Sequence, residues 1–70
     1  MKPVTSFGKA IKFALIEKGK KQAWLIEEVK NKTGLYFDSS YLYKILIGTQ
    51  KNPNIVKAIK EILGIEMEVE

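Results

Sequence analysis

The sequence DSSYLYKILIG, residues 38–48, predicts a short helix with two different faces. Asp38 is a favourable N-cap, and Gly48 is a favourable stop. Three apolar residues fall on one side at helical spacing: Leu42, Ile45 and Leu46. The opposite side is polar and aromatic, with one cation and no acid. The pattern therefore predicts one face that packs on a core and one face that is available to a partner.

Two segments with helical periodicity precede this helix. The first begins at Thr5 or Ser6, either of which can cap a helix, and it ends at Gly19. The second spans about residues 21–32 and ends before Gly34. The apolar stripes are Phe7, Ala10, Ile11, Ala14 and Leu15 in the first segment and Leu25, Ile26 and Val29 in the second. Each stripe predicts a helix that buries one face in a common core.

A fourth helical segment follows the residues quoted above. Asn52 can cap it, Pro53 takes the first helical position, which suits proline, and Gly64 ends it. Its apolar stripe is Ile55, Val56, Ile59, Ile62 and Leu63. We therefore expect residues 1–65 to form one all-α domain, a compact bundle of four short helices.

The last six residues have a different period. Ile65, Met67 and Val69 alternate with Glu66, Glu68 and Glu70. A period of two suits a half-buried strand, so residues 66–70 are predicted to be an acidic, strand-like tail, a possible short C-terminal β-strand. Its partner would be the start of the chain near Val4 or the same segment of a second molecule. The alternative is a frayed acidic terminus.

The 70 residues contain neither cysteine nor histidine. Disulfides and zinc–thiolate sites are therefore excluded, and the commonest general base near neutral pH is absent. We expect no enzyme, no metal, no cofactor and no small-molecule substrate, because the five glycines fall at segment boundaries and not in a phosphate-binding loop. The longest apolar runs have four residues, too few to cross a membrane, so the sequence predicts a soluble cytoplasmic protein.

The charge is unevenly distributed along the chain. The net charge is +4, but three of the eight acids lie in the last five positions, so residues 1–65 carry twelve lysines against five acids, a net +7. Such an excess attracts polyanions, nucleic acid above all, although it also suits a surface that only confers solubility. All twelve cations are lysine. A DNA-binding surface would therefore work through flexible point charges, without the bidentate guanine contact of arginine.

The outward face of the 38–48 helix supplies hydroxyl groups, rings and one cation that suit the edges of bases. The candidate base contacts are Ser39, Ser40, Tyr41, Tyr43 and Lys44, with core packing an equal alternative for Tyr41. Asp38 is better interpreted as the cap. Two flanking clusters suit phosphates, one at the start of the second helix and one in the turn after Gly48: Lys20, Lys21 and Gln22, and Thr49, Gln50, Lys51 and Asn52. Capping and loop roles are the alternative for these residues.

A family resemblance rests on residues spread over most of the chain. They are Ile11, Gly19, Gln22, Leu25, Gly34-Leu35, the run from Ser40 to Ile45, Gly48, Ile59 and Leu63-Gly64-Ile65. This pattern resembles the Cro and phage-repressor helix-turn-helix family, also called the xenobiotic-response-element family.

The resemblance implies a lambda-repressor-like fold and a transcriptional regulator, such as a repressor, of phage or mobile-element type. It implies that Gln22 touches the DNA backbone and that the exposed residues of the third helix enter the major groove. It further implies phosphate contacts by the loop of residues 49–52 and a homodimer on two half-sites of double-stranded DNA.

The chain also departs from the family pattern. Between Leu25 and Gly34 this chain has about four residues more than the family pattern. The extra residues predict a longer second helix or a wider turn. Four apolar side chains lie off the predicted stripes or point outward: Phe13, Ile16, Trp24 and Ile47. They form either an exposed patch or a surface covered by the tail or the long second helix. An alternative function is therefore a protein-interaction module of the same fold, similar to an antirepressor or antitoxin.

Overall fold

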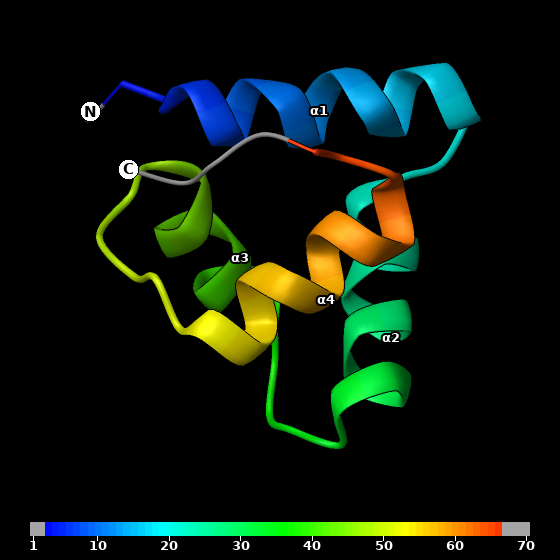
Figure 1. Cartoon of the computed structure of the whole chain (residues 1–70), viewed down its shortest axis with the longest axis vertical. Coiled ribbons are helices and arrows are strands. Elements are labelled where there is room, and N and C mark those ends of the chain that lie inside the picture. The colour runs from blue at the N-terminus through cyan, green and yellow to red at the C-terminus, as the bar shows by residue number, and fades with distance from the viewer. Residues whose placement is uncertain (1–2, 67–70) are drawn as a thin grey trace.

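The computed structural model describes residues 3–66, which contain four helices. They are α1 (Ser6–Lys18), α2 (Gln22–Thr33), α3 (Ser39–Leu46) and α4 (Pro53–Leu63). Helix α1 lies across one end of the other three (Figure 1). The predicted all-α class and its four short helices are confirmed, and α3 ends two residues before Gly48.

Three of the helices begin at a side-chain cap. The Thr5 hydroxyl accepts a hydrogen bond from the Gly8 amide at 3.0 Å, and the Asp38 carboxylate accepts one from the Tyr41 amide at 2.8 Å. The Asn52 side-chain oxygen accepts from the amide of Asn54 at 2.9 Å. These bonds satisfy amides that have no partner inside a helix and so define where each helix starts. Helix α2 differs, because Lys21 at its N-cap makes no such bond.

The core is formed by residues of the predicted stripes and by two residues outside them, Phe37 and Ala58. Leu25, Leu42, Ile55 and other stripe residues are fully buried. Phe37, in the connection between α2 and α3, is also buried, with 1% of its surface exposed. Its ring centroid lies 5.1 Å from that of Tyr41. The aromatic pair therefore attaches the α2–α3 connection to the core.

The start of α1 is held closely against the end of α3. The amide and the hydroxyl of Thr5 both donate to the Leu46 carbonyl, at 3.0 and 3.1 Å. Gly8 is buried at this crossing, where an added Cβ would lie 2.3 Å from the Leu46 oxygen. The prediction that every glycine falls at a segment boundary is thus wrong for Gly8, which lies inside α1 because only a residue without a side chain fits there.

The four apolar side chains off the predicted stripes, expected as either an exposed patch or a covered surface, differ in their exposure. Phe13 and Ile16 are 62% and 77% exposed on α1. Trp24 is half-buried and packs against the core, and Ile47 is half-buried as well. Of the two alternatives that the sequence left open, the exposed patch fits Phe13 and Ile16, and the covered surface fits Trp24 and Ile47.

The predicted C-terminal strand lies mostly outside the described residues. Within residues 3–66 there is no strand. Ile65 is half-buried against the core, Glu66 is exposed, and residues 67–70 are not described. No helix in the described part of the chain is both long and apolar enough to cross a membrane.

Candidate nucleic-acid interface

Helix α3 presents a polar face to solvent. Ser39, Ser40 and Lys44 are exposed, and Tyr43 is 48% exposed. The opposite face carries the buried residues Leu42, Ile45 and Leu46. The structure therefore brings four of the five predicted base contacts to the surface on one short helix.

The fifth predicted base contact, Tyr41, is held differently. Its ring is half-buried against the core and inclined at 52° to the ring of Phe37. Of the two roles that the sequence left open, core packing is observed. A base contact by the remaining surface of Tyr41 stays a prediction.

Asp38 is occupied at the start of α3. Its carboxylate accepts hydrogen bonds from the Tyr41 amide and from the Tyr36 hydroxyl. The bond from Tyr36 has the largest effect in holding the pKa of Asp38 below its usual value. The bond from the Tyr41 amide and the charge of Lys44 act in the same direction. The same contact raises the pKa of the Tyr36 phenol. The interpretation of Asp38 as the cap is confirmed.

Tyr36 is a surface residue that the sequence interpretation passed over. It is 75% exposed, and its bond to Asp38 places the phenol beside the first turn of α3. Leu35 next to it is 41% exposed. The sequence contained a signal, because Tyr36 precedes a buried Phe37 and neighbouring residues of an extended segment face opposite sides.

The connection between α1 and α2 carries the first phosphate cluster. Lys20, Lys21 and Gln22 are all exposed. The Lys20 ammonium lies 5.6 Å from the centroid of the Trp24 ring, a cation–π contact that restrains this cation near the helix start. Lys21 supplies no side-chain cap, and the Trp24 amide donates to the Lys21 carbonyl at 3.1 Å. The positive end of the α2 dipole at this start would favour an anion.

The connection between α3 and α4 carries the second cluster. Thr49, Gln50 and Lys51 are exposed. The Thr49 and Gln50 amides donate to the Lys44 carbonyl at 3.0 and 3.3 Å, which folds the connection back on the end of α3. Asn52 is half-buried and its oxygen is used in capping α4, so only its NH₂ group is left to donate to a phosphate.

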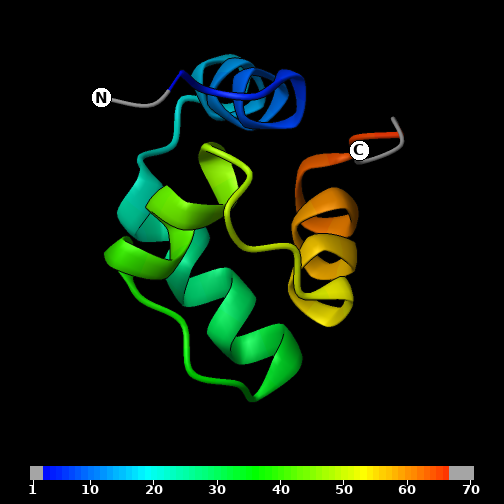
Figure 2. The ribbon, with the colours of Figure 1, turned by 90° about the vertical axis from the view of Figure 1, so that its left-hand side faces the viewer.

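The two clusters lie on different sides of α3. In Figure 2, α3 faces the viewer, α2 begins behind it on the left, and the connection to α4 leaves on its right. Among residues 3–66 the only ion pair is Lys30–Glu27, at 3.7 Å on α2. The charges of Lys20, Lys21, Lys44 and Lys51 are therefore not neutralised by an ion pair within the described residues.

The chain is a small all-helical domain of four helices. Comparison with protein-family models, curated proteins and solved structures finds no match. The resemblance to a known family therefore comes from the motif residues of the sequence.

Proposed function

We propose that this chain is a sequence-specific double-stranded DNA-binding transcriptional regulator similar to the Cro and phage-repressor family. Helices α2 and α3 would form its helix-turn-helix, with α3 reading the major groove. One observation carries the proposal: the exposed face of α3 presents hydroxyls, a phenol and one cation between two connections that carry lysines. A surface of this chemistry suits base edges in its centre and phosphates on its flanks.

The side chains on α3 define what would be read. Serine hydroxyls donate or accept, so Ser39 and Ser40 fit several base edges. The Lys44 ammonium only donates, which favours the O6 and N7 acceptors of guanine. The Tyr43 ring suits packing on a thymine methyl group, or its hydroxyl suits a phosphate.

The flanking clusters would supply most of the affinity. Each lysine that neutralises a phosphate releases counterions, and the logarithm of the binding constant then falls with the logarithm of salt by about 0.9 per contact. Lys20, Lys21 and Lys51 are exposed for this role. The free amides at the start of α2 would add a contact that carries no sequence information.

Two lysine variants and one matched control test the proposal. A selection from random duplex would supply the preferred sequence, and fluorescence anisotropy would then compare that duplex with a scrambled one. Lys44→Gln should weaken binding to the preferred duplex by about 1–3 kcal/mol with little effect on the scrambled one. Lys51→Gln should weaken both alike and reduce the salt slope by about 1.

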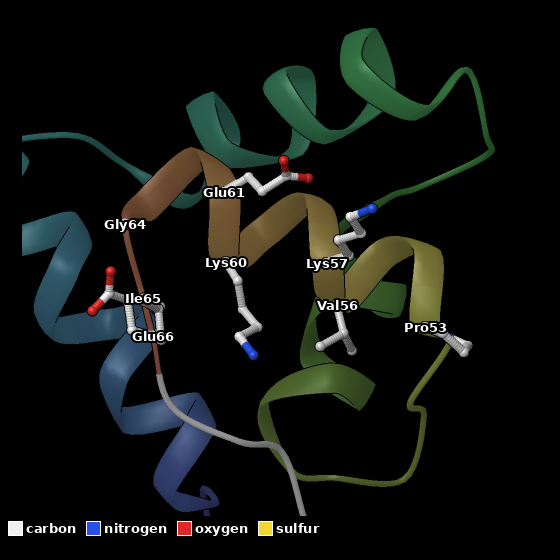
Figure 3. Close-up of a pocket in the computed structure, with 8 residues that line it drawn as sticks. All are labelled: Pro53, Val56, Lys57, Lys60, Glu61, Gly64, Ile65 and Glu66. Atoms are coloured by element: carbon white, nitrogen blue, oxygen red, sulfur yellow. The ribbon is translucent and has the colours of Figure 1, made fainter.

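Lys57→Gln is the control, since it removes the same charge from an exposed lysine of α4 that is not among the predicted contacts (Figure 3). It should leave both affinities nearly unchanged. Equal losses on the two duplexes for Lys44→Gln would remove its role in base readout.

A protein-interaction module is the second candidate, because Phe13 and Ile16 are 62% and 77% exposed. They lie three residues apart on α1 and so share one side of that helix. A chain of this kind would keep its helical circular dichroism but would not retard any duplex even at low salt. Retardation of random duplex favours the DNA-binding proposal instead.

A homodimer on two half-sites is part of the DNA-binding proposal. Two copies of α3 related by a two-fold axis would enter successive major grooves on one side of the duplex. The selected sequence should then be palindromic, with half-sites about one helical turn apart. Light scattering of the complex should give the mass of one duplex plus two chains.

A further inference from the structure

The outer face of α1 carries a row of side chains with opposite charges at its two ends. Lys9, Phe13 and Glu17 are spaced by four residues, so they follow one another along the same side of the helix. All three are exposed, Phe13 by 62%. Within residues 3–66 neither Lys9 nor Glu17 takes part in an ion pair. The row thus presents a cation, an aromatic ring and an acid at equal spacing.

The rest of the molecule leaves this face of α1 open. In both ribbon views α2, α3 and α4 lie on one side of α1 (Figure 1, Figure 2). The side of α1 that packs in the core carries Phe7, Ile11 and Leu15, all buried. Ile16, next to the row on the outer face, is 77% exposed. A second molecule therefore has access to α1 from the side opposite the other three helices.

We propose that α1 is a homodimer surface on which two copies pack antiparallel about a two-fold axis at Phe13. Such an axis places residues at equal distances before and after Phe13 opposite each other. Lys9 of each copy then faces Glu17 of the other, which gives two ion pairs around a central pair of Phe13 rings. Rows of this i, i+4 type pack with the helix axes crossed at about −50°, so that each Phe13 enters the groove between Phe13 and Ile16 of the other copy.

The charges of α1 favour this arrangement over other pairings of the same helix. A parallel pair would place Lys9 against Lys9 and Glu17 against Glu17, and both contacts would be repulsive. An antiparallel pair centred on Ile16 has no acid to use, because the residues four positions before and after it are both lysines, Lys12 and Lys20. An axis at Phe13 is therefore the arrangement in which opposite charges meet at both ends.

A second copy also fits the face better than an acidic protein would. The exposed lysines Lys9 and Lys12 would attract acidic groups, but Glu17, the only acid of α1, would then face a like charge. A second copy offers an acid to Lys9 and a lysine to Glu17. Lys12 lies on the flank of the row, where its ammonium stays in water.

The size of the contact predicts a weak dimer. One helix on one helix buries less than the standard interface, which covers about 800 Å² on each partner. Phe13 at the centre is the residue type that contributes most in such contacts. We therefore expect a reversible equilibrium between monomer and dimer, with both forms present between about 10 µM and about 1 mM.

Sedimentation equilibrium of the full chain without DNA measures this dimer over that concentration range. Lys9→Glu and Glu17→Lys should each raise the dissociation constant at least about tenfold, because each turns both ion pairs into like-charge contacts. Lys57→Glu, the same charge change at an exposed lysine of α4, is the control and should leave the dissociation constant nearly unchanged. A chain that stays monomeric throughout overturns the proposal, as do single variants that dimerise like the unmodified chain.

A mixture of the two single variants tests the pairing itself. In a mixed dimer every contact between positions 9 and 17 joins opposite charges. An equal mixture of Lys9→Glu and Glu17→Lys should therefore dimerise about as well as the unmodified chain. A mixture that stays monomeric, with the helical circular dichroism of both variants intact, overturns the antiparallel pairing.

This inference gives the homodimer of the proposed function a surface, but its evidence comes from α1 and its test contains no DNA. A monomeric chain would leave the reading of DNA by α3 in place. A dimer that retards no duplex would leave the α1 surface in place and remove the DNA-binding proposal.

Discussion

Gly8 is the position where one added methyl group should disturb the fold most. The Cβ of an alanine would lie 2.3 Å from the Leu46 oxygen and 2.5 Å from a Val4 methyl. The Val4 contact is with a side-chain atom, whereas the Leu46 oxygen is backbone in the last turn of α3. Since real Cβ atoms essentially never approach closer than 3.0 Å, α1 and α3 must separate by at least the difference, 0.7 Å.

Two opposing terms set the size of the effect of Gly8→Ala. Alanine in place of glycine inside a helix is favourable by about 1 kcal/mol. Overpacking costs about 1–3 kcal/mol, and the separation stretches both hydrogen bonds from Thr5 to Leu46, each worth about 1 kcal/mol. The free energy of unfolding should therefore fall by about 2–4 kcal/mol, which lowers the Tm of a 70-residue domain by roughly 10–30 °C.

Thermal and urea unfolding followed by circular dichroism at 222 nm would measure this loss. Gly34→Ala is the control, because Gly34 has φ of 69° and open space around an added Cβ, so it isolates the backbone cost of about 1 kcal/mol. A Gly8→Ala chain that melts at or above the temperature of the unmodified chain would refute the close approach of α1 and α3.

Three further predictions concern α3 and its flanks. Leu42→Ala, at a fully buried site, should lower the free energy of unfolding by about 2–5 kcal/mol in urea titrations, and wild-type stability would contradict its place in the core. The pKa of Asp38 is lower in the folded chain than in the unfolded chain, so the Asp38 carboxylate stabilises the fold above the unfolded pKa near 4 and loses this effect as pH falls through the folded pKa. Tm measured from pH 6 to pH 2 should therefore drop more for the unmodified chain than for Asp38→Asn. Asn52→Asp keeps the oxygen that caps α4 but adds a negative charge beside the proposed phosphate contacts. Tm should therefore stay unchanged while binding to every duplex weakens. Unchanged affinities in anisotropy titrations would exclude this loop from the interface.

Local chemistry accounts for what the sequence predicted correctly. The caps at Thr5, Asp38 and Asn52 act within three residues of themselves, so they mark helix starts without knowledge of the fold. The outward face of α3 follows in the same way from the spacing of its apolar residues.

The positions that were missed depend on contacts between distant segments. Phe37 is buried from a connection that has no helical period, and Trp24 is covered by packing that a single helix does not reveal. Gly8 contacts Leu46, thirty-eight positions away in the sequence, so no local pattern marks it as a crossing point. Tyr36 is different, because its hydroxyl bonds Asp38 only two residues away, and its signal in the sequence was therefore local.

The shortness of α3 links stability to recognition. Its eight residues make about two turns, and helices shorter than about twelve residues are marginal in water on their own. Its order must therefore come from its buried face and from its two fixed ends, Asp38 at the start and the Thr5–Leu46 contact at the finish.

Neither end is fixed by a residue of the exposed face. Changes to Ser40 or Lys44 should consequently alter which duplex is bound at nearly constant stability, whereas a change at Gly8 should move the whole face and weaken every duplex together. Measuring Tm and the preferred-to-scrambled affinity ratio for Lys44→Gln and Gly8→Ala separates these two effects. If Gly8→Ala lowered Tm but left all affinities unchanged in the folded state, the position of α3 relative to α1 would have no part in binding.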